Sequence, residues 1–314
     1  AGPLPLGAAL RSPLCAQPTL AHRALVAMQK AGHFHRWINQ NHDGLPQKAG
    51  LPQACINEIH GAWHAPDNPV VQMSGALCDT LYSDLLECER TADLVLAVGT
   101  SLCGMNADRI VTTPAERAAR GESGVLGSVV VGLQRTVHDE DATLRIFARC
   151  DDVFELLAAE LGLEVAPASP DGEYFTPAAL VGLDEDHYVF PGLPYGVDGQ
   201  RRSDVERAKA PACLRWDLRD EAALVIAGGP HAGAVGVADG LDREGNVRCR
   251  FTLKPKVGKL RAPVAMLLGR WWIQAAVEGS VPALPVVNSP AEGDLSPEAQ
   301  RLRDLMDAYA RPQA

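Results

Sequence analysis

The sequence lacks any pair of cysteines at C-x-x-C spacing, although it contains eight cysteines. Structural zinc sites are commonly built from such pairs, so a zinc site of this kind is excluded and no bound metal is expected. Disulfide frameworks belong to short secreted chains, whereas these cysteines are scattered over 314 residues. The cysteines are therefore predicted to be free thiols in a reducing, intracellular compartment.

Long apolar runs and an excess of basic residues are also missing. No uninterrupted apolar segment approaches the roughly 20 residues that span a bilayer, and the first residues lack a signal peptide's charged end and apolar core. With 29 Lys and Arg against 39 Asp and Glu, the net charge of −10 disfavours a general electrostatic grip on nucleic acid or anionic lipid. We expect a soluble protein with neither a membrane nor a nucleic-acid partner.

The first half of the chain does contain an alternation of helix and strand patterns. Apolar residues at helical spacing predict helices over 18–32, 83–92 and 151–162, the last capped by Asp151 or Asp152. Strands are predicted at 33–39, 55–61, 93–101, 128–134 and 143–148. The stretch DLVLAVGTS at 93–101 is typical of a parallel strand buried on both faces. The alternation predicts an α/β fold, a Rossmann-like parallel sheet with helices on both faces.

Three polar loops follow these strands: NQNHDG at 39–44, EIHG at 58–61 and GTS at 99–101. In such sheets, ligands bind at the carboxyl ends of the strands. Taken alone, NHDG is also explained as a simple turn, because Asn and Asp bond to their own backbone and Gly takes positive φ. Other loop histidines are expected to be ordinary surface residues: His33, His35, His42 and His64.

The pattern changes near residue 165, which divides the chain into predicted domains 1–166 and 167–314. In the second, short strand patterns alternate with turn residues, including a hairpin over 238–246, and helices are predicted over 261–279 and 296–310. This is an α+β domain. Trp271 and Trp272 lie about 100° apart on a helix, so one of them is expected to meet the first domain or a partner chain. The alternative is that both are buried between the two halves.

Five blocks of the first domain resemble those of the sirtuin (Sir2) family, in the family order and at compatible spacing. They are PTLAHRAL, INQNHDGLPQKAGLP, INEIHG, ADLVLAVGTSL and LQRTVHDEDATLRIFARCDDVFELLAAELGLE. The resemblance covers about residues 16–165 and is closest to the class of the nuclear and nucleolar animal enzymes. It implies a truncated form of the large Rossmann-like domain of an NAD-dependent protein-lysine deacylase, with NAD as cofactor and an acylated protein as substrate.

The resemblance also implies roles for individual residues. His60 would be the catalytic base, with Asn41 beside it, and Asn41 and Asp43 would line the pocket for the nicotinamide carboxamide. Gln40 would contact the nicotinamide ribose. A neutral imidazole suits removal of a ribose hydroxyl proton near neutral pH, and an amide with a carboxylate suits a group that both donates and accepts. The adenosine half would lie against Gly99, Thr100, Ser101 and Cys150.

Three departures from the family pattern bear on activity. A GAGxS phosphate-binding turn at the start and a zinc module after the histidine are not found, and Gly132 stands where many relatives carry an asparagine that bonds the adenosine ribose. Two functions therefore stay open. One is a degenerate, catalytically silent pseudoenzyme that serves as a scaffold or subunit of a larger assembly. The other is an active NAD-dependent deacylase completed by an N-terminal segment outside this sequence.

A nucleic-acid module is a third class of function, and it rests on one basic cluster near residue 257. Such a cluster is more typical of a solvated hairpin end or a protein contact. Protein partners are therefore expected rather than nucleic acid. The cluster consists of Lys254, Lys256, Lys259 and Arg261.

Overall fold

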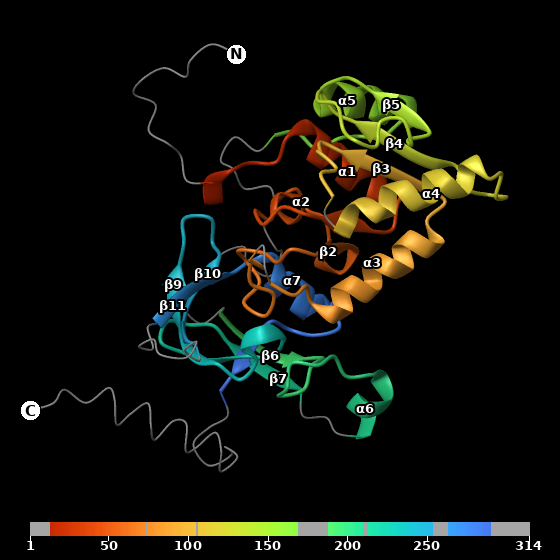
Figure 1. Cartoon of the computed structure of the whole chain (residues 1–314). Helices are drawn as coiled ribbons and strands as arrows, with labels where there is room; N and C mark the ends of the chain where they lie inside the picture. The colour runs from red at the N-terminus through yellow and green to blue at the C-terminus, as the bar shows by residue number, and fades with distance from the viewer. Residues whose placement is uncertain are drawn as a thin grey trace, which may run out of the picture.

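The computed structural model describes residues 13–72, 75–104, 106–168, 188–209, 213–253 and 263–289. Parallel α/β layers form the first half of the molecule, and an antiparallel sheet with helix α7 lies beside them (Figure 1). Within these ranges, no helix is long and apolar enough to cross a bilayer. All eight cysteines are free, as predicted. Two predicted features lie outside the described residues: the helix over 296–310 and the basic cluster of Lys254, Lys256, Lys259 and Arg261.

A three-stranded parallel sheet forms the centre of the first half. Its strands lie in the order β3 (Leu94–Val98), β4 (Gly127–Val131) and β5 (Leu144–Ile146). Strands were predicted at all three places. The helices of this half are α1 (Leu20–Lys30), α2 (Leu45–Lys48), α3 (Asp79–Thr91), α4 (Arg109–Ala119), α5 (Cys150–Glu160) and the 3-10 helices η1 (Pro13–Cys15), η2 (Gln53–Cys55) and η3 (Asn106–Asp108).

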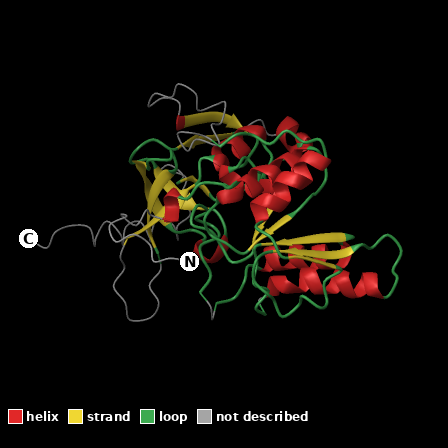
Figure 2. Ribbon diagram, turned by 90° about the horizontal axis from the view of Figure 1, so that it is seen from above, coloured by secondary structure: helices red, strands yellow, loops and turns green. Residues whose placement is uncertain are grey.

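Helices cover both faces of this sheet, because successive side chains of a strand point in opposite directions. On one face, Leu96 and Val98 pack against the cluster formed by α1 and α5. On the other face, Val95 and Ala97 pack against α4. Viewed from above, helices flank the strands (Figure 2). The predicted α/β class is confirmed.

A separate parallel pair carries the first two polar loops. It consists of β1 (Trp37–Asn39) and β2 (Ile56–Glu58). Among the described residues, β1 pairs only with β2, and β3 pairs only with β4. The prediction that 93–101 is buried on both faces is wrong at its start, because Leu94 is 42% exposed.

The second half is built on a five-stranded antiparallel sheet in the order β11-β10-β9-β8-β12. The predicted hairpin connects β9 and β10, and the Asp242 carboxylate closes it by accepting the backbone N–H groups of Glu244 and Asn246 at 2.8 and 2.9 Å. The elements of this half are β6 (Val189–Leu193), α6 (Asp204–Lys209), β7 (Leu214–Asp217), β8 (Ala223–Ile226), η6 (Gly229–His231), β9 (Val235–Leu241), β10 (Val247–Thr252), β11 (Pro263–Leu268), α7 (Trp271–Glu278) and β12 (Val286–Asn288).

The single helix predicted over 261–279 is wrong in its first part. Residues Pro263–Leu268 form β11, which pairs antiparallel with β10 from Thr252 opposite Pro263 to Val247 opposite Leu268. Pro263 opens the strand, where its missing N–H is tolerated. Gly269 separates the strand from α7, which begins at Trp271. Pairing with a distant strand therefore overrides the helical spacing of this apolar run.

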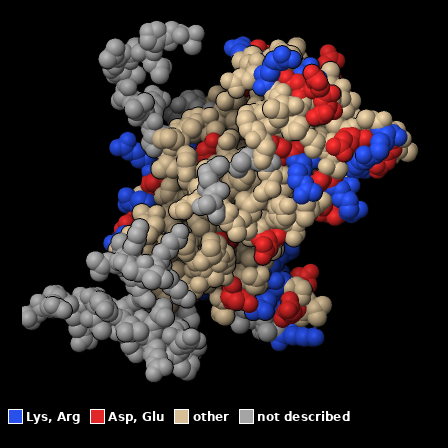
Figure 3. Space-filling model, viewed as in Figure 1, with Lys and Arg blue, Asp and Glu red and all other residues tan. Residues whose placement is uncertain are grey.

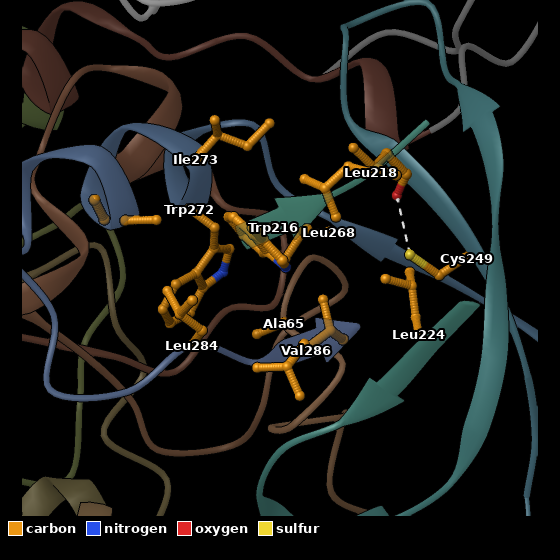
Figure 4. Packing of buried hydrophobic residues seen from close by; sticks show 14 of the residues in the cluster. Ala65, Trp216, Leu218, Leu224, Cys249, Leu268, Trp272, Ile273, Leu284 and Val286 are labelled. Carbon is orange, nitrogen blue, oxygen red and sulfur yellow. Dashed lines mark hydrogen bonds between the residues drawn. The ribbon is translucent and has the colours of Figure 1, made fainter. Parts of the chain in front are cut away.

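The core of the second half includes residues of the first. Trp216, Leu268 and Leu284 are almost wholly buried in it, and Ala62 and Ala65 belong to the same cluster. Figure 4 shows the rings of Trp216 and Trp272 packed beside Leu284, with Ala65 pointing toward the same centre. The segment after β2 is thus shared between the halves. The division into units 1–166 and 167–314 stays a prediction.

Asp151 joins two helices instead of capping its own. The residue before α5 is Arg149, and no side chain caps this helix. The Asp151 carboxylate instead accepts the backbone N–H of Ala21, in the first turn of α1, at 2.8 Å. Asp152 pairs with Arg149 on the surface at 2.6 Å. The predicted cap is therefore wrong, because α1 lies close enough to take the carboxylate.

Replacing Asp151 with Ala is expected to lower the free energy of unfolding by about 1 kcal/mol, because an N-terminal N–H of α1 loses its acceptor. Asp152→Ala is the matched control. It removes an exposed ion pair and is expected to change stability by less than about 0.5 kcal/mol. Urea unfolding followed by circular dichroism measures both, and equal losses would contradict the assignment.

Candidate functional site

The parallel pairing of β1 and β2 brings two of the polar loops to one edge. The register places Trp37 opposite Ile56 and Asn39 opposite Glu58. Because the strands run in the same direction, the loops after Asn39 and Glu58 leave the pair side by side. Gln40, Asn41 and Asp43 lie on the first loop and His60 on the second. The structure therefore places the predicted residues of both loops together.

The first loop is held by its own side chains. The Asn39 carboxamide oxygen accepts the N–H of Asn41 at 3.2 Å, and the Asp43 carboxylate accepts the N–H of Leu45 at 3.0 Å. Gly44 adopts φ +68° at the start of α2. The predicted turn is thus present. The Asn41 side chain is exposed, so its amide faces outward from a fixed backbone.

The third loop meets the first through a side-chain hydrogen bond. Thr100, two residues after β3, donates its hydroxyl to the Gln40 carboxamide oxygen at 3.2 Å. The same hydroxyl accepts the N–H of Leu102 at 3.3 Å, which shapes the turn. The Gln40 backbone also lies beside the His60 imidazole, where it favours the protonated form of the ring. One residue therefore connects all three loops.

His60 is held in its neutral form. Burial is the largest cause that lowers its pKa, and nearby His42 lowers it further. The Gln40 backbone and the charge of Asp108 oppose this shift without reversing it. Loss of water around a half-buried imidazole disfavours its charged form. At pH 7, His60 is therefore a neutral group with one nitrogen able to accept a proton.

Gly99 and Cys150 lie together on the other side of the GTS turn. Gly99 adopts φ +63°, and a Cβ placed there would be 3.6 Å from the Cys150 sulfur. Cys150 is the first residue of α5, and burial, followed by the charge of Asp151, raises the pKa of its thiol. The thiol is thus kept protonated. Ser101, the last predicted residue of this group, is exposed.

The prediction of surface positions holds for two histidines and fails for two. His33 and His35 are exposed. His42 is half-buried, and its Nδ1 bonds the Gly61 carbonyl at 2.8 Å, which ties the first loop to the second. His64 is 1% exposed and lies against Trp271 of α7. Trp271, in the second half of the chain, covers His64, and the sequence around His64 gives no sign of this contact.

Glu58 is a buried residue at the end of β2, directly before the second loop. It is 3% exposed, and its carboxylate accepts the side-chain N–H of Gln53 at 3.3 Å. Burial raises the pKa of this carboxyl from 4.5 to about 7, and the hydrogen bonds from Gln47 and Gln53 reduce the shift. Its second oxygen has no partner in the part of the chain that the structure describes. The group is therefore close to half-protonated at neutral pH.

Sequence reasoning missed Asp108, Glu58 and Gln53. Asp108 is 5% exposed, accepts the N–H of Gly104 at 2.6 Å and acts on the charge of His60. The one signal for Glu58 was an acidic residue inside the apolar strand INEI. Asp108 and Gln53 stand in ordinary loop sequence and carried no such signal. Among the described residues, no group of three or more His, Cys, Asp and Glu side chains could hold a metal ion.

Comparison with known proteins found similarity to the Sir2 family. The profile of the Sir2 family matches residues 8–74. The chain is similar to the NAD-dependent protein deacetylase sirtuin-7 of Homo sapiens, with 27% identity over 195 residues that cover 48% of this chain and 47% of the relative. An NAD-dependent protein deacetylase of Arabidopsis thaliana is 29% identical over 189 residues, with 48% and 38% covered. The chain thus spans less than half the length of these relatives.

Solved structures give a weaker likeness. A structure of Sir2 with a p53 peptide and NAD+ is 20% identical, with a TM-score of 0.42, and the match covers 49% of this chain and 75% of that one. A structure of Sir2 bound to an acetylated peptide also has 20% identity and a TM-score of 0.42. The match in each case extends over about half of this chain.

The raised pKa of Glu58 predicts a pH dependence of stability. Its folded state binds the proton more tightly than its unfolded state, so its contribution to stability is lost as pH rises from about 4.5 to 7. Glu58→Gln is expected to remove that loss, so that the variant gains about 3 kcal/mol over the wild type between pH 4.5 and pH 8. Urea unfolding across this pH range measures the difference.

The control for this prediction is Glu155→Gln, which changes an exposed glutamate on α5. It is expected to leave the difference from wild type constant with pH. If Glu58→Gln also followed the wild-type curve at every pH, Glu58 would be ionised in the folded protein and its assignment as a buried acid would be wrong.

Proposed function

Because this chain belongs to the sirtuin (Sir2) family, we propose that its three-loop cluster is an NAD-binding site of the Sir2 type. We further propose that the chain serves as an NAD-binding subunit of a protein assembly rather than as a complete deacylase. The single observation that carries the first proposal is the position of Gln40. Its side chain accepts a hydrogen bond from Thr100 and its backbone lies beside the His60 imidazole, so residues of all three loops converge.

The residues present fit such a cofactor. Asn41 and Asp43 would hold the nicotinamide carboxamide, and Gln40 would contact the neighbouring ribose. Gly99, whose positive φ turns the chain sharply after β3, would let the backbone approach the adenosine half. Thr100, Ser101 and Cys150 border the same region. When bound, NAD would supply an activated ribose carbon to which an acyl-lysine oxygen can add.

His60 is suited to accept a proton in such a site. In the neutral imidazole one ring nitrogen carries the hydrogen, and the other is able to accept a proton. Burial keeps the imidazole neutral, so this nitrogen is available at physiological pH. His42 fixes the second loop from the other side by its bond to the Gly61 carbonyl. The proton would therefore move from a ribose hydroxyl to the free ring nitrogen of His60.

Two observations support a subunit role over complete catalysis. The segment after His60 enters the core of the second half through Ala62 and Ala65, where the family resemblance would place a zinc module. In the described residues, β1 and β3 each leave one strand edge without a ladder partner. The site is thus embedded in a second structural half and stands beside an incomplete sheet. Both features favour a protein that works in combination with other chains.

An active deacylase is the second candidate function. It is favoured by the presence of all four predicted loop residues at one edge of the β1–β2 pair: Gln40, Asn41, Asp43 and His60. Turnover of an acetyl-lysine peptide, dependent on NAD and on His60, would establish this candidate.

Isothermal titration with NAD tests the first proposal. The wild type is expected to bind with a dissociation constant in the millimolar range or tighter. Asn41→Ala is expected to weaken binding about five- to tenfold, because an exposed amide directed at the ligand is lost. His33→Ala, which truncates an exposed histidine away from the loops, is expected to leave binding unchanged. Absence of binding heat in the wild type would overturn the NAD proposal.

A further inference from the structure

The first residue of α7 reaches both loops of the proposed site from the other half of the chain. We infer that Trp271 is a positioning residue: its indole fixes the loop after β1 and the loop after β2 in the arrangement that the ligand requires. The identity of the ligand rests on the proposed function, whereas the positioning itself does not. In Figure 1, α7 lies between the antiparallel sheet and the segment that carries these loops.

The indole packs against the first loop at Gly44. A Cβ added to Gly44 would lie 2.8 Å from the Trp271 Cη2 atom, a separation too short for any real side chain. Gly44 directly follows Asp43 and adopts φ +68°. The backbone at this point therefore rests against the ring. Any movement of the ring would release the turn that sets the directions of Asn41 and Asp43.

The same ring lies against the segment that follows His60. Its centroid is 5.1 Å from that of His64, with an angle of 57° between the planes. Next to it, the Gly269 N–H donates to the His64 carbonyl at 3.0 Å. Neither ring nitrogen of His64 has a hydrogen-bond partner among the residues described. The indole is therefore one of the groups that cover this buried imidazole.

A hydrogen-bonded chain continues from the indole to β2. The Trp271 Nε1–H donates to the Gln53 carboxamide oxygen at 2.9 Å, and Gln53 donates to the Glu58 carboxylate at 3.3 Å. Glu58 precedes His60 by two residues and lies opposite Asn39 in the β1–β2 register. The indole thus contacts Gly44 and His64, which lie within four residues of Asp43 and His60, and it reaches β2 through Gln53.

Trp272 provides a matched control in the next position. It is 7% exposed, against 4% for Trp271, and both are on the same helix. The Trp272 Nε1–H has no partner in the described part of the chain, and its ring packs in the core of the second half (Figure 4). A Phe at either position removes a similar volume. Only the change at 271 removes the hydrogen bond to Gln53.

The test compares Trp271→Phe with Trp272→Phe by hydrogen exchange of the full chain. Trp271→Phe is expected to speed amide exchange in 40–48 and 56–64 about five- to tenfold, because one buried hydrogen bond and its packing are lost. Trp272→Phe is expected to leave these segments at the wild-type rate. Equal exchange in both variants, or no change in either loop, would overturn the inference.

A second variant keeps the test decisive if Trp271→Phe does not fold. Gln53→Met keeps the indole and the approximate shape of the side chain but breaks the chain from Trp271 to Glu58 at Gln53, and the same two segments are expected to exchange faster. Titration with NAD then separates the two proposals. Loops that loosen in a protein that never binds NAD would sustain the positioning role and overturn the proposed function. A wild type that binds NAD, with equal affinity in Trp271→Phe, would overturn the positioning role.

Discussion

The rest of the site depends on a short parallel pairing, three residues of β1 against three of β2. A pair of this length cannot stand alone in water, because two strands bury too little apolar surface. It is held from two sides. On one side, the Asn57 amide donates to the Leu81 carbonyl and to Asp84 of α3 at 2.7 and 2.6 Å. On the other side, α7 bonds Gln53, so the pair exists because both halves clamp it.

The packing around the β1–β2 pair places the Glu58 carboxyl group in a buried position where an apolar side chain would be more stable. Glu58 keeps hydrogen bonds from neighbouring amides but remains in a poorly solvated position, which raises its pKa to about 7. A buried carboxyl near half-protonation is tolerated where it fixes a particular arrangement of strands and loops. On the surface, by contrast, basic and acidic residues are interspersed over the upper helices (Figure 3). The unusual charge environment therefore belongs to the interior beneath the loops.

Local sequence patterns predicted the central strands well, because apolar runs such as LVLAV at 94–98 have few alternatives. They failed where contacts with distant parts of the chain determine the local structure. Helix α4 was not predicted, because Pro114 interrupts its helical pattern. The segment VAMLL at 264–268 is a strand because it pairs with β10. The convergence of Gln40 with Thr100, 60 residues away, was predictable only from family resemblance. The bond between Gln53 and Trp271 spans 218 residues, and no pattern in either segment indicates it.

The ion pair between Lys48 and Glu244 extends this connection to the turn of the β9–β10 hairpin. The ammonium group is 2.7 Å from the carboxylate, and it also donates to the carbonyl oxygens of Leu14 and Ala16. One lysine thus neutralises a charge in the later part of the chain and caps an early segment. Replacing either partner would leave the other charge half-buried without its counterion, so a change in the hairpin turn would be felt at α2, about 200 residues earlier in the chain.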